Sequence, residues 1–364
     1  MTILTLLGWF ILGLVLLVGG AELLVRGAQR ISLMLGISPL IVGLTIVAFG
    51  TSAPEVAVSV EAALKGSADL VIGNIVGSNI SNILLVLGFS AALSPMVVSR
   101  KLVRVDVPIM IGITIIMYMM SLNGMVGLTE SIVLLLLLIG YILFLVIHER
   151  RERAEKVDED EVIITTSFQS YALNALIFIA GLFLLVKGSG FLVDSAVELA
   201  TFLGLSELII GLTIVSIGTS LPELATSVVA SMKGERNLAV GNIVGSNIFN
   251  LLLVLGVTGI ASGEGVAVPE SAINFDILVM LAVSIACLPI FYRGYGLQRW
   301  EGWVFLAYYA AYITYLVLAS VGYPNILVFE NAMAYFAIPI TSLTFLTLAF
   351  IWLKGRKNKD VPDV

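Results

Sequence analysis

The chain has 364 residues, of which 59% are hydrophobic and only 12% are charged, and its mean hydropathy is +1.08. A soluble domain of this size could not cover so much apolar surface with so few charged residues, which excludes a soluble globular fold. The formal net charge of −6 says little, because the placement of the charges matters more than their sum. Cys287 is the single cysteine, so an internal disulfide is impossible.

Eleven apolar segments follow one another along the chain, each close to the ~20 residues that a helix needs to cross a bilayer core. The first starts at the N-terminus, which has neither a basic region nor a small-residue cleavage site, so we interpret it as a span and not as a removed signal peptide. The predicted spans are 3–25, 38–64, 70–95, 106–121, 127–148, 167–192, 207–232, 237–262, 273–292, 300–321 and 332–353.

A charged stretch, HERRERAEKVDEDE at 148–161, separates the fifth span from the sixth. We predict a solvated cytoplasmic linker over 149–166. Its acidic end has neither the ligand spacing nor the loop glycine of an EF-hand, so calcium sensing there has no support. The linker divides a first five-helix unit, 1–148, from a second, 167–321. Residues 322–364 add an eleventh span and a basic tail.

The positions of the basic residues predict the orientation of the spans. If the N-terminus is outside, the connections on the inner side hold all of the 19 Lys and Arg residues except Lys65 and Lys187. Connections facing the cytoplasm carry such an excess of basic residues. With a wrong number of spans, the basic residues would be distributed over both sides of the membrane. We therefore predict eleven spans with the N-terminus outside and the C-terminus inside.

The most informative feature is an internal repeat. Residues 36–88 match residues 204–256 without a gap, at an offset of 168, with 35 of 53 positions identical. Each repeat unit contains five spans, an odd number, so the second copy enters the membrane from the opposite side. This is the inverted-repeat plan of secondary transporters, which place the substrate site at the repeat interface. The predicted fold is an all-α polytopic membrane protein with two inverted five-helix repeats and one extra C-terminal helix.

The motif Gly-Thr-Ser-x-Pro-Glu occurs at 50–55 and 218–223, near the centre of an apolar span in each repeat. Proline lacks an N–H and clashes with the carbonyl one turn earlier, so each motif should break its helix and free a carbonyl, such as that of Gly50, to line a cavity. Glu55 and Glu223 follow the prolines, and a carboxylate at this depth needs a partner. No lysine or arginine lies inside these spans, which leaves a cation, or a proton when no ion is bound.

The span after each motif adds small residues and more oxygen atoms. Two glycine pairs spaced by four residues, Gly73 with Gly77 and Gly241 with Gly245, permit close helix contact. The oxygen-bearing residues are Asn74, Ser78, Asn79 and Asn82 in the first repeat and Asn242, Ser246, Asn247 and Asn250 in the second. These hard oxygen ligands suit Ca²⁺ or Na⁺ and not zinc or copper. The two glutamates together carry a charge of −2, which one Ca²⁺ balances.

The paired motifs resemble the α-repeats of the calcium/cation antiporter superfamily, most closely its prokaryotic sodium/calcium exchanger branch. The likeness covers the span layout of residues 1–321 and the motifs of 36–88 and 204–256. By this resemblance Glu55 and Glu223 are the shared carboxylates of a Ca²⁺ site. The remaining implied ligands are hydroxyl, carbonyl and amide oxygens. They are Thr51 and Thr219 beside Ca²⁺, Ser52, Ser78, Ser220 and Ser246 at flanking Na⁺ sites with the carbonyls of Ala48 and Ser216, and Asn82 and Asn250 at the centre.

The sequence departs from the family pattern at one position, since many exchangers have an aspartate where this chain has Asn250. The site is therefore more symmetric than usual and lacks a third ionisable group. Three Na⁺ against two carboxylates would leave about one surplus positive charge, which fits electrogenic 3:1 exchange. The departure leaves both the stoichiometry and the choice between Na⁺ and H⁺ open.

The leading functional prediction is antiport of Ca²⁺ against Na⁺ by alternating access at one shared site. Ca²⁺/H⁺ exchange is the first alternative and a cation channel a more remote one. An enzyme is not expected, because the only histidine, His148, lies at a membrane edge without a nucleophile or metal cluster. The expected partners are Ca²⁺, Na⁺ or H⁺ and the lipid bilayer, with no cofactor, nucleic acid or obligatory protein partner. The expected location is a prokaryotic inner membrane.

Overall fold

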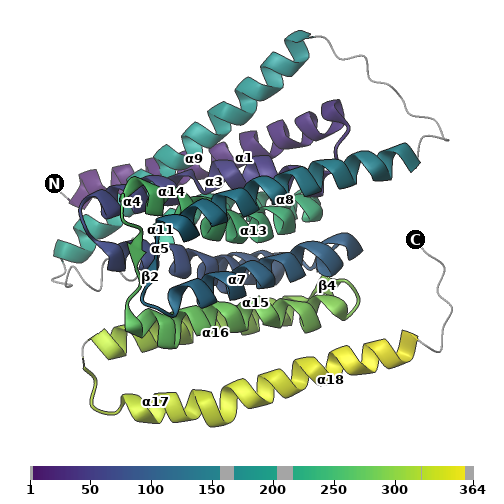
Figure 1. The fold of residues 1–364 in the computed structure, drawn as a ribbon. Coiled ribbons are helices and arrows are strands. Elements are labelled where there is room, and N and C mark those ends of the chain that lie inside the picture. The colour runs from purple at the N-terminus through teal and green to yellow at the C-terminus, as the bar shows by residue number, and fades with distance from the viewer. Residues whose placement is uncertain (1–2, 156–167, 203–215, 321, 357–364) are drawn as a thin grey trace.

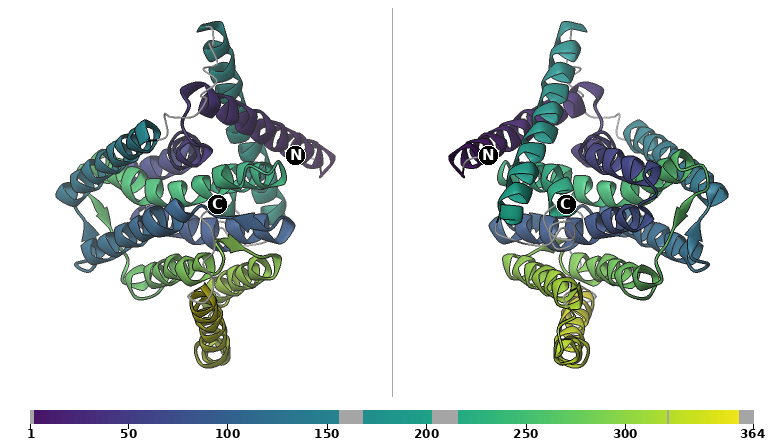
Figure 2. Two further views of the ribbon diagram at one scale, coloured as in Figure 1. Left: turned by 90° about the vertical axis from the view of Figure 1, so that its right-hand side faces the viewer. Right: turned by 90° about the vertical axis from the view of Figure 1, so that its left-hand side faces the viewer.

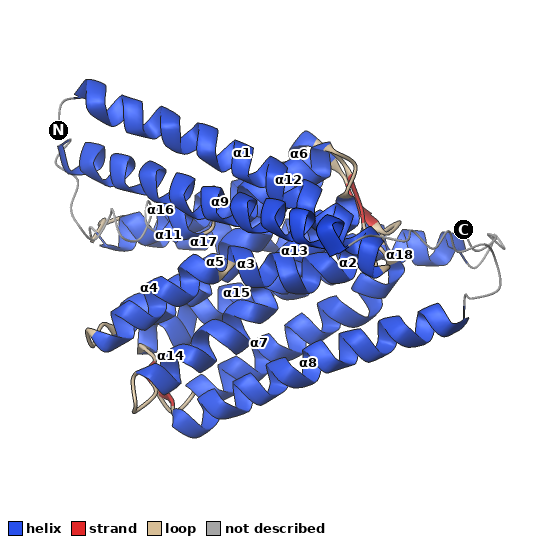
Figure 3. Cartoon of the chain, turned by 90° about the horizontal axis from the view of Figure 1, so that it is seen from above, coloured by secondary structure: helices blue, strands red, loops and turns tan. Residues whose placement is uncertain are grey.

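The structure is a computed structural model that describes residues 3–155, 168–202, 216–320 and 322–356. Within these ranges the chain is almost entirely helical, which confirms the predicted all-α class (Figure 3). Nine of the described helices are long and apolar enough to cross a membrane, and one bent helix pair makes a tenth. The first part of the predicted seventh span, 207–232, lies outside the described residues.

The first repeat unit contains five spans, and several of them are interrupted. Its elements are α1 (Ile3–Leu35), α2 (Pro39–Val42), η1 (Gly43–Val47), α3 (Ala48–Thr51), α4 (Ala53–Leu64), α5 (Ala68–Ser81), η2 (Asn82–Leu87), α6 (Gly88–Leu93), β1 (Met96–Val97), η3 (Leu102–Asp106), α7 (Val107–Ser121), β2 (Met125–Val126) and α8 (Leu128–Glu155). The elements marked η are π-helical turns, which often occur at functional positions inside membrane helices.

The second unit repeats this order, and an additional helix follows it. Its elements are α9 (Phe168–Phe202), α11 (Ser216–Thr219), α12 (Leu221–Met232), α13 (Arg236–Phe249), η5 (Asn250–Val254), α14 (Leu255–Ala261), β3 (Val266–Ala267), η6 (Ala272–Asp276), α15 (Ile277–Tyr292), β4 (Gly296–Leu297) and α16 (Arg299–Ser320). The eleventh span consists of α17 (Ile326–Ala332), η7 (Met333–Ala337) and α18 (Ile338–Arg356).

Three helices extend beyond the predicted apolar spans. The span expected at 3–25 continues ten residues further, to Leu35, and the span expected at 167–192 continues to Phe202. Helix α8 continues through the first charged residues after position 148 and ends at Glu155. The remainder of the predicted linker, from 156 onward, lies outside the described residues. Apolar length therefore underestimated the helices, because a helix can leave the membrane core without ending.

The two spans that follow the motifs form the centre of the molecule. In the hydrophobic windows of α5–α6 and α13–α14, 78% and 83% of the residues are buried, against 33% or less for α1, α9 and α16. Figures 1 and 2 show α1 and α9 crossing one side of the bundle, with α17 and α18 on the opposite side. A buried, largely apolar helix surrounded by others can hold polar groups away from lipid.

Two short antiparallel strand pairs connect the repeats at opposite ends of the bundle. Strand β1 pairs with β4, and β2 pairs with β3, and Figure 1 labels β2 and β4 at the two ends. The chain order within each repeat makes β1 the counterpart of β3 and β2 the counterpart of β4. The two pairs are therefore equivalent under a pseudo-two-fold axis, as an inverted repeat requires.

Glycines hold α1 and α9 in unusually close contact. A Cβ atom built on Gly20 would lie 2.6 Å from the backbone nitrogen of Leu185, and one on Gly188 would lie 2.6 Å from that of Leu17. Gly20 and Gly188 are separated by the repeat offset of 168. Small residues allow helix backbones to approach in a membrane, where packing and not the hydrophobic effect drives association. The contact between α1 and α9 therefore follows the same inverted repeat as the central helices.

Candidate functional site

Each motif breaks its helix at the serine. Helix α3 ends at Thr51 and α4 begins at Ala53, and the two parts of this span are bent by 41°. Ser52 has φ −79° and ψ 3°, and Ser220 has φ −85° and ψ 2°, so both repeats adopt the same local conformation. The proline is the second residue of the following helix, where its missing N–H costs nothing. The predicted helix break is present in both described motifs.

The carbonyl freed by the second proline has a protein partner. Pro222 leaves the carbonyl of Gly218 without its helical donor, and Ser189 Oγ on α9 donates a hydrogen bond to that oxygen at 2.7 Å. Freed carbonyls were expected to face the ion cavity, and at Gly218 the structure corrects this. Ala21 occupies the position of Ser189 in the first repeat and cannot donate such a bond. The two helix breaks are therefore supported differently.

This difference predicts the effect of Ser189→Ala on stability. Leaving a buried carbonyl without its donor costs about 1–3 kcal/mol, so we expect thermal unfolding in detergent at a lower temperature. Ser284→Ala is the matched control, because Ser284 is also buried but donates only within its own helix, to the carbonyl of Met280 at 2.7 Å. Equal losses for the two variants would contradict an interhelical role of Ser189.

The two motif glutamates are fully buried. Glu55 and Glu223 each have 0% of their surface exposed, and both lie in the first turn after the break, in α4 and α12. Ser246 Oγ donates to Glu223 Oε1 at 3.3 Å. Both carboxylate oxygens of Glu55 and Oε2 of Glu223 have no hydrogen-bond partner among the described residues. A buried charge in this condition requires a partner from outside the protein chain.

A symmetric hydrogen-bond network joins the two repeats around these carboxylates. Thr51 Oγ1 donates to Asn242 Oδ1 at 3.2 Å, and Thr219 Oγ1 donates to Asn74 Oδ1 at 3.2 Å. These two bonds exchange under the repeat offset of 168. The same threonines approach serines of the opposite repeat, in the pairs Thr51 with Ser246 at 3.4 Å and Thr219 with Ser78 at 3.5 Å. The predicted threonines and serines therefore converge at one place.

Two further serines orient the asparagines of this network. Asn74 Nδ2 donates to Ser59 Oγ at 2.9 Å, and Asn242 Nδ2 donates to Ser227 Oγ at 3.1 Å. Each bond directs the amide nitrogen toward a serine of its own repeat, so that the amide oxygen faces the threonine of the other repeat. Ser59 and Ser227 were not among the residues predicted from the sequence. Their separation by the repeat offset, with both identities preserved, was the signal that could have found them.

Four more predicted residues are buried and lack partners. The hydroxyls of Ser52 and Ser220 and both amide atoms of Asn82 and Asn250 form no hydrogen bond with a described residue. Asn82 and Asn250 are the first residues of the π-helical turns η2 and η5. Buried polar groups are nearly always hydrogen-bonded. The turns η2 and η5 pack against α12 and α4, the helices of Glu223 and Glu55, so these unpartnered groups indicate the position of a polar ligand.

The two predicted backbone ligands are less well defined. The Ala48 carbonyl, in the first residue of α3, accepts a hydrogen bond from the Ser52 backbone nitrogen at 3.0 Å. The Thr51 hydroxyl also donates to this carbonyl, at 3.5 Å, so both of its lone pairs have a partner in the protein. Ser216 is the first described residue of its span and begins α11. Their roles as ligands stay predictions.

Close packing places α13 against the first broken span. A Cβ atom on Gly241 would lie 2.7 Å from the carbonyl oxygen of Leu40, and one on Gly245 would lie 2.8 Å from the Cα of Leu44. The predicted close contact at Gly241 and Gly245 is therefore present. The segment that would face Gly73 and Gly77 by repeat symmetry lies within 203–215, outside the described residues.

The donor set is chemically uniform. In the described ranges no three His, Cys, Asp or Glu side chains come together as a metal-binding group. The site therefore has two carboxylates, surrounded by hydroxyl and amide oxygens from both repeats. Hard cations such as Ca²⁺ and Na⁺ bind to oxygen ligands of this kind.

Comparisons with known proteins agree with this arrangement. The model of the family described as sodium/calcium exchanger protein matches residues 5–147 and 173–318. The sodium/calcium exchanger MaX1 of Methanosarcina acetivorans is 33% identical over 342 residues, which cover 84% of this chain and 97% of MaX1. The inner membrane protein YrbG of Escherichia coli is 38% identical over 279 residues, covering 76% of this chain and 85% of YrbG. The prediction of a multi-span membrane protein is thereby confirmed.

Among solved structures, the sodium–calcium exchanger NCX_Mj has a TM-score of 0.75 to this chain and 31% sequence identity. The match covers 86% of this chain and 99% of NCX_Mj. The family match spans both repeats and ends before the eleventh helix. Fold, repeat and sequence lead to one conclusion: the chain is a cation antiporter that belongs to the sodium/calcium exchanger protein family.

Proposed function

We propose that the chain exchanges Ca²⁺ for Na⁺ across the membrane by alternating access at the site between the two repeats. The observation that carries the proposal is the pair of fully buried glutamates, Glu55 and Glu223, in two inverted broken helices. Three of their four carboxylate oxygens have no hydrogen-bond partner among the described residues. In the proposed Ca²⁺-bound state, these carboxylates neutralise the ion, and Thr51 and Thr219 add oxygen ligands beside them. Neutralisation explains how two acids can remain ionised within a membrane protein.

The polar groups beyond the carboxylates support Na⁺ as the counter-ion. Exchange against protons needs only groups that titrate, and the two glutamates would suffice. The unpartnered hydroxyls of Ser52 and Ser220 and the amides of Asn82 and Asn250 would then be buried at a cost and without use. Bound Na⁺ ions would use these oxygens as ligands, together with Ser78 and Ser246. The relative MaX1 is named as a sodium/calcium exchanger, which agrees with this choice.

Alternating access follows from the symmetry of the site. The two halves make equivalent hydrogen bonds to each other beside the carboxylates, so two conformations related by exchange of the halves would open the site to opposite sides. A carrier binds its substrates mutually exclusively, because two carboxylates cannot neutralise Ca²⁺ and three Na⁺ together. This competition between the ions at one site couples their fluxes.

Transport assays with purified protein test the choice of counter-ion. We expect proteoliposomes loaded with Na⁺ to accumulate Ca²⁺ from a Na⁺-free medium, whereas liposomes loaded with choline and subjected to a pH gradient should not. Liposomes loaded with Na⁺ but carrying Glu55→Gln control for leakage. Uptake driven by the pH gradient alone would replace the sodium assignment by proton exchange. Uptake that continues without any counter-ion gradient, at rates that do not saturate with Ca²⁺, would indicate a channel.

A further inference from the structure

The eleventh helix lies apart from the ion-transporting repeats. Neither repeat contains a counterpart of α17–α18, and the family match ends at residue 318. Among its residues from Ile326 to Leu348 whose burial is described, Phe345 alone is buried. Figure 2 shows the helix on the side of the bundle opposite α1 and α9. Its function is therefore to be sought in its own contacts with α15 and α16.

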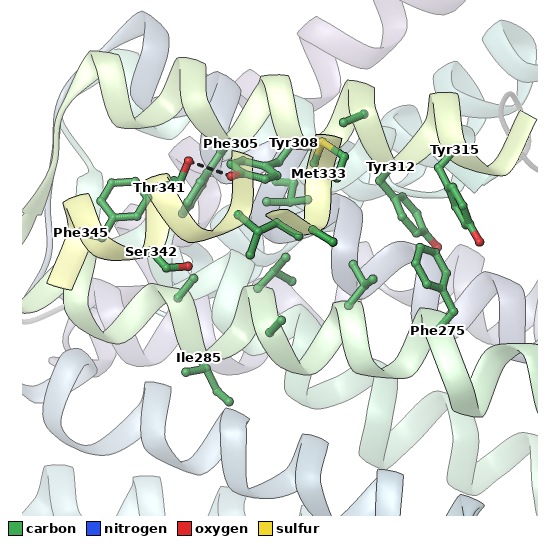
Figure 4. Close-up of a pocket in the computed structure, with 18 of the residues that line it drawn as sticks. Phe275, Ile285, Phe305, Tyr308, Tyr312, Tyr315, Met333, Thr341, Ser342 and Phe345 are labelled. Carbon is green, nitrogen blue, oxygen red and sulfur yellow. Dashed lines mark hydrogen bonds between the residues drawn. The ribbon is translucent and has the colours of Figure 1, made fainter. Parts of the chain in front are cut away.

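Among the described residues, only a few side-chain contacts attach this helix to the neighbouring helices. The hydroxyl of Tyr308 on α16 donates to the carbonyl of Ala337 at 2.9 Å and lies 2.8 Å from Thr341 Oγ1 (Figure 4). Ala337 is the last residue of the π-helical turn η7. The rings of Trp300 and Phe345 stack with centroids 5.8 Å apart. These contacts attach the helix at its middle, between Ala337 and Phe345.

Between these helices lies an apolar cavity of about 590 Å³. Its walls are side chains of α15, α16, η7 and α18, including Ala282, Ile285, Phe305 and Met333 (Figure 4). This volume lies within the range of about 300–1,000 Å³ that is typical of small-molecule sites. Helices in a bilayer are held together by packing. An empty gap of this size would leave the side chains that line it without packing contacts. An apolar molecule that fills the gap would restore them.

One end of the cavity is acidic. Glu330 is the single charged side chain among the described residues that line it. It interacts with the hydroxyl of Tyr315, which lies beside Tyr312 in Figure 4. Asp276 Oδ1 accepts a hydrogen bond from the Tyr312 hydroxyl at 2.8 Å. The sequence contains no lysine or arginine from 262 to 292 or from 300 to 353. An anionic group would meet repulsion at this end, whereas an ammonium group would be attracted.

We propose that this cavity binds one phospholipid of the bilayer, with an acyl chain between α15, α16 and α18 and an amino headgroup of the phosphatidylethanolamine type at Glu330. The apolar walls match the acyl chain, and the acidic end matches the ammonium group. The lipid joins the eleventh helix to the second repeat where protein contacts are sparse. This inference is independent of the ion that the central site exchanges.

Native mass spectrometry of the full chain, extracted in mild detergent, tests the lipid itself. We expect wild-type protein to retain one phosphatidylethanolamine and Ala282→Phe, which fills the cavity, to lose it. Ala172→Phe is the matched control, since Ala172 is also exposed in a membrane helix but lies outside the cavity lining; it should retain the lipid. Equal retention by Ala282→Phe and Ala172→Phe, or no lipid on wild-type protein, would overturn the proposal.

The headgroup is tested by adding lipids to delipidated protein. Wild-type protein should bind phosphatidylethanolamine at least roughly tenfold more tightly than phosphatidylglycerol, a difference of one decade in Kd. Glu330→Gln should reduce this preference. Glu264→Gln should leave it unchanged, because Glu264 is exposed and lies outside the cavity lining. Equal binding of the two lipids to wild-type protein would refute the assignment. This experiment uses no destabilising variant, and Na⁺-driven Ca²⁺ uptake reports separately on the central site.

Discussion

Glutamine at position 55 or 223 is expected to reduce Na⁺-driven Ca²⁺ uptake by at least roughly 100-fold. Removing one partner from a buried ionic site costs about 3–5 kcal/mol, and each 1.4 kcal/mol corresponds to a factor of about ten. Glutamine keeps the size of glutamate but removes the negative charge, so the remaining carboxylate cannot neutralise Ca²⁺. Because both glutamates are fully buried, solvent cannot compensate for the lost charge.

The measurement is Ca²⁺ uptake into Na⁺-loaded proteoliposomes, with Ca²⁺ binding followed separately by calorimetry. Glu61→Gln is the control, because Glu61 lies on the same helix, α4, but is exposed and pairs with Lys65. The control should transport at the wild-type rate. The symmetry of the site predicts similar losses for Glu55→Gln and Glu223→Gln. Near-normal uptake by either glutamine variant would refute the shared carboxylate site.

The repeat made much of the site predictable. The self-match at a fixed offset identified which serines, threonines and asparagines are equivalent in the two repeats. The proline rule predicted a helix break within each motif, and the structure places the breaks at Ser52 and Ser220. In the structure these residues converge in equivalent hydrogen bonds, such as Thr51 to Asn242 and Thr219 to Asn74. Internal symmetry thus supplied long-range information that hydrophobic periodicity alone does not contain. Their function as ligands, and the orientation of the chain in the membrane, stay predictions.

Other features were not predictable because they depend on tertiary contacts. The extension of α1 to Leu35 occurs where apolar content falls, yet Ala28 is fully buried and a Cβ on Gly27 would lie 2.9 Å from Phe178. Packing against α9 therefore continues the helix beyond its apolar segment. The bond from Ser189 to Gly218 also has no sequence signal, since Ala21 at the equivalent position breaks the symmetry.

The glycines at the contact between α1 and α9 are expected to be sensitive to substitution. Gly20→Ala should destabilise the protein by about 1–3 kcal/mol, the usual cost of overpacking, and should reduce transport. An added Cβ would lie 2.6 Å from the Leu185 nitrogen and 2.8 Å from the Gly181 oxygen. Both atoms are backbone, so no side chain can rotate away and the two helices must separate.

The adjacent glycine supplies the control. A Cβ on Gly19 would meet nothing within 4 Å, so Gly19→Ala should be neutral or stabilise the helix by up to about 1 kcal/mol. The second repeat offers the same comparison between Gly188, which faces the backbone of Leu17 at 2.6 Å, and Gly190, which faces nothing within 4 Å. Thermal unfolding in detergent compares the members of each pair. If the tight and open positions tolerate alanine equally, backbone contact does not hold α1 against α9. If only the tight positions fail, the inverted repeat specifies this helix pair as well as the ion site.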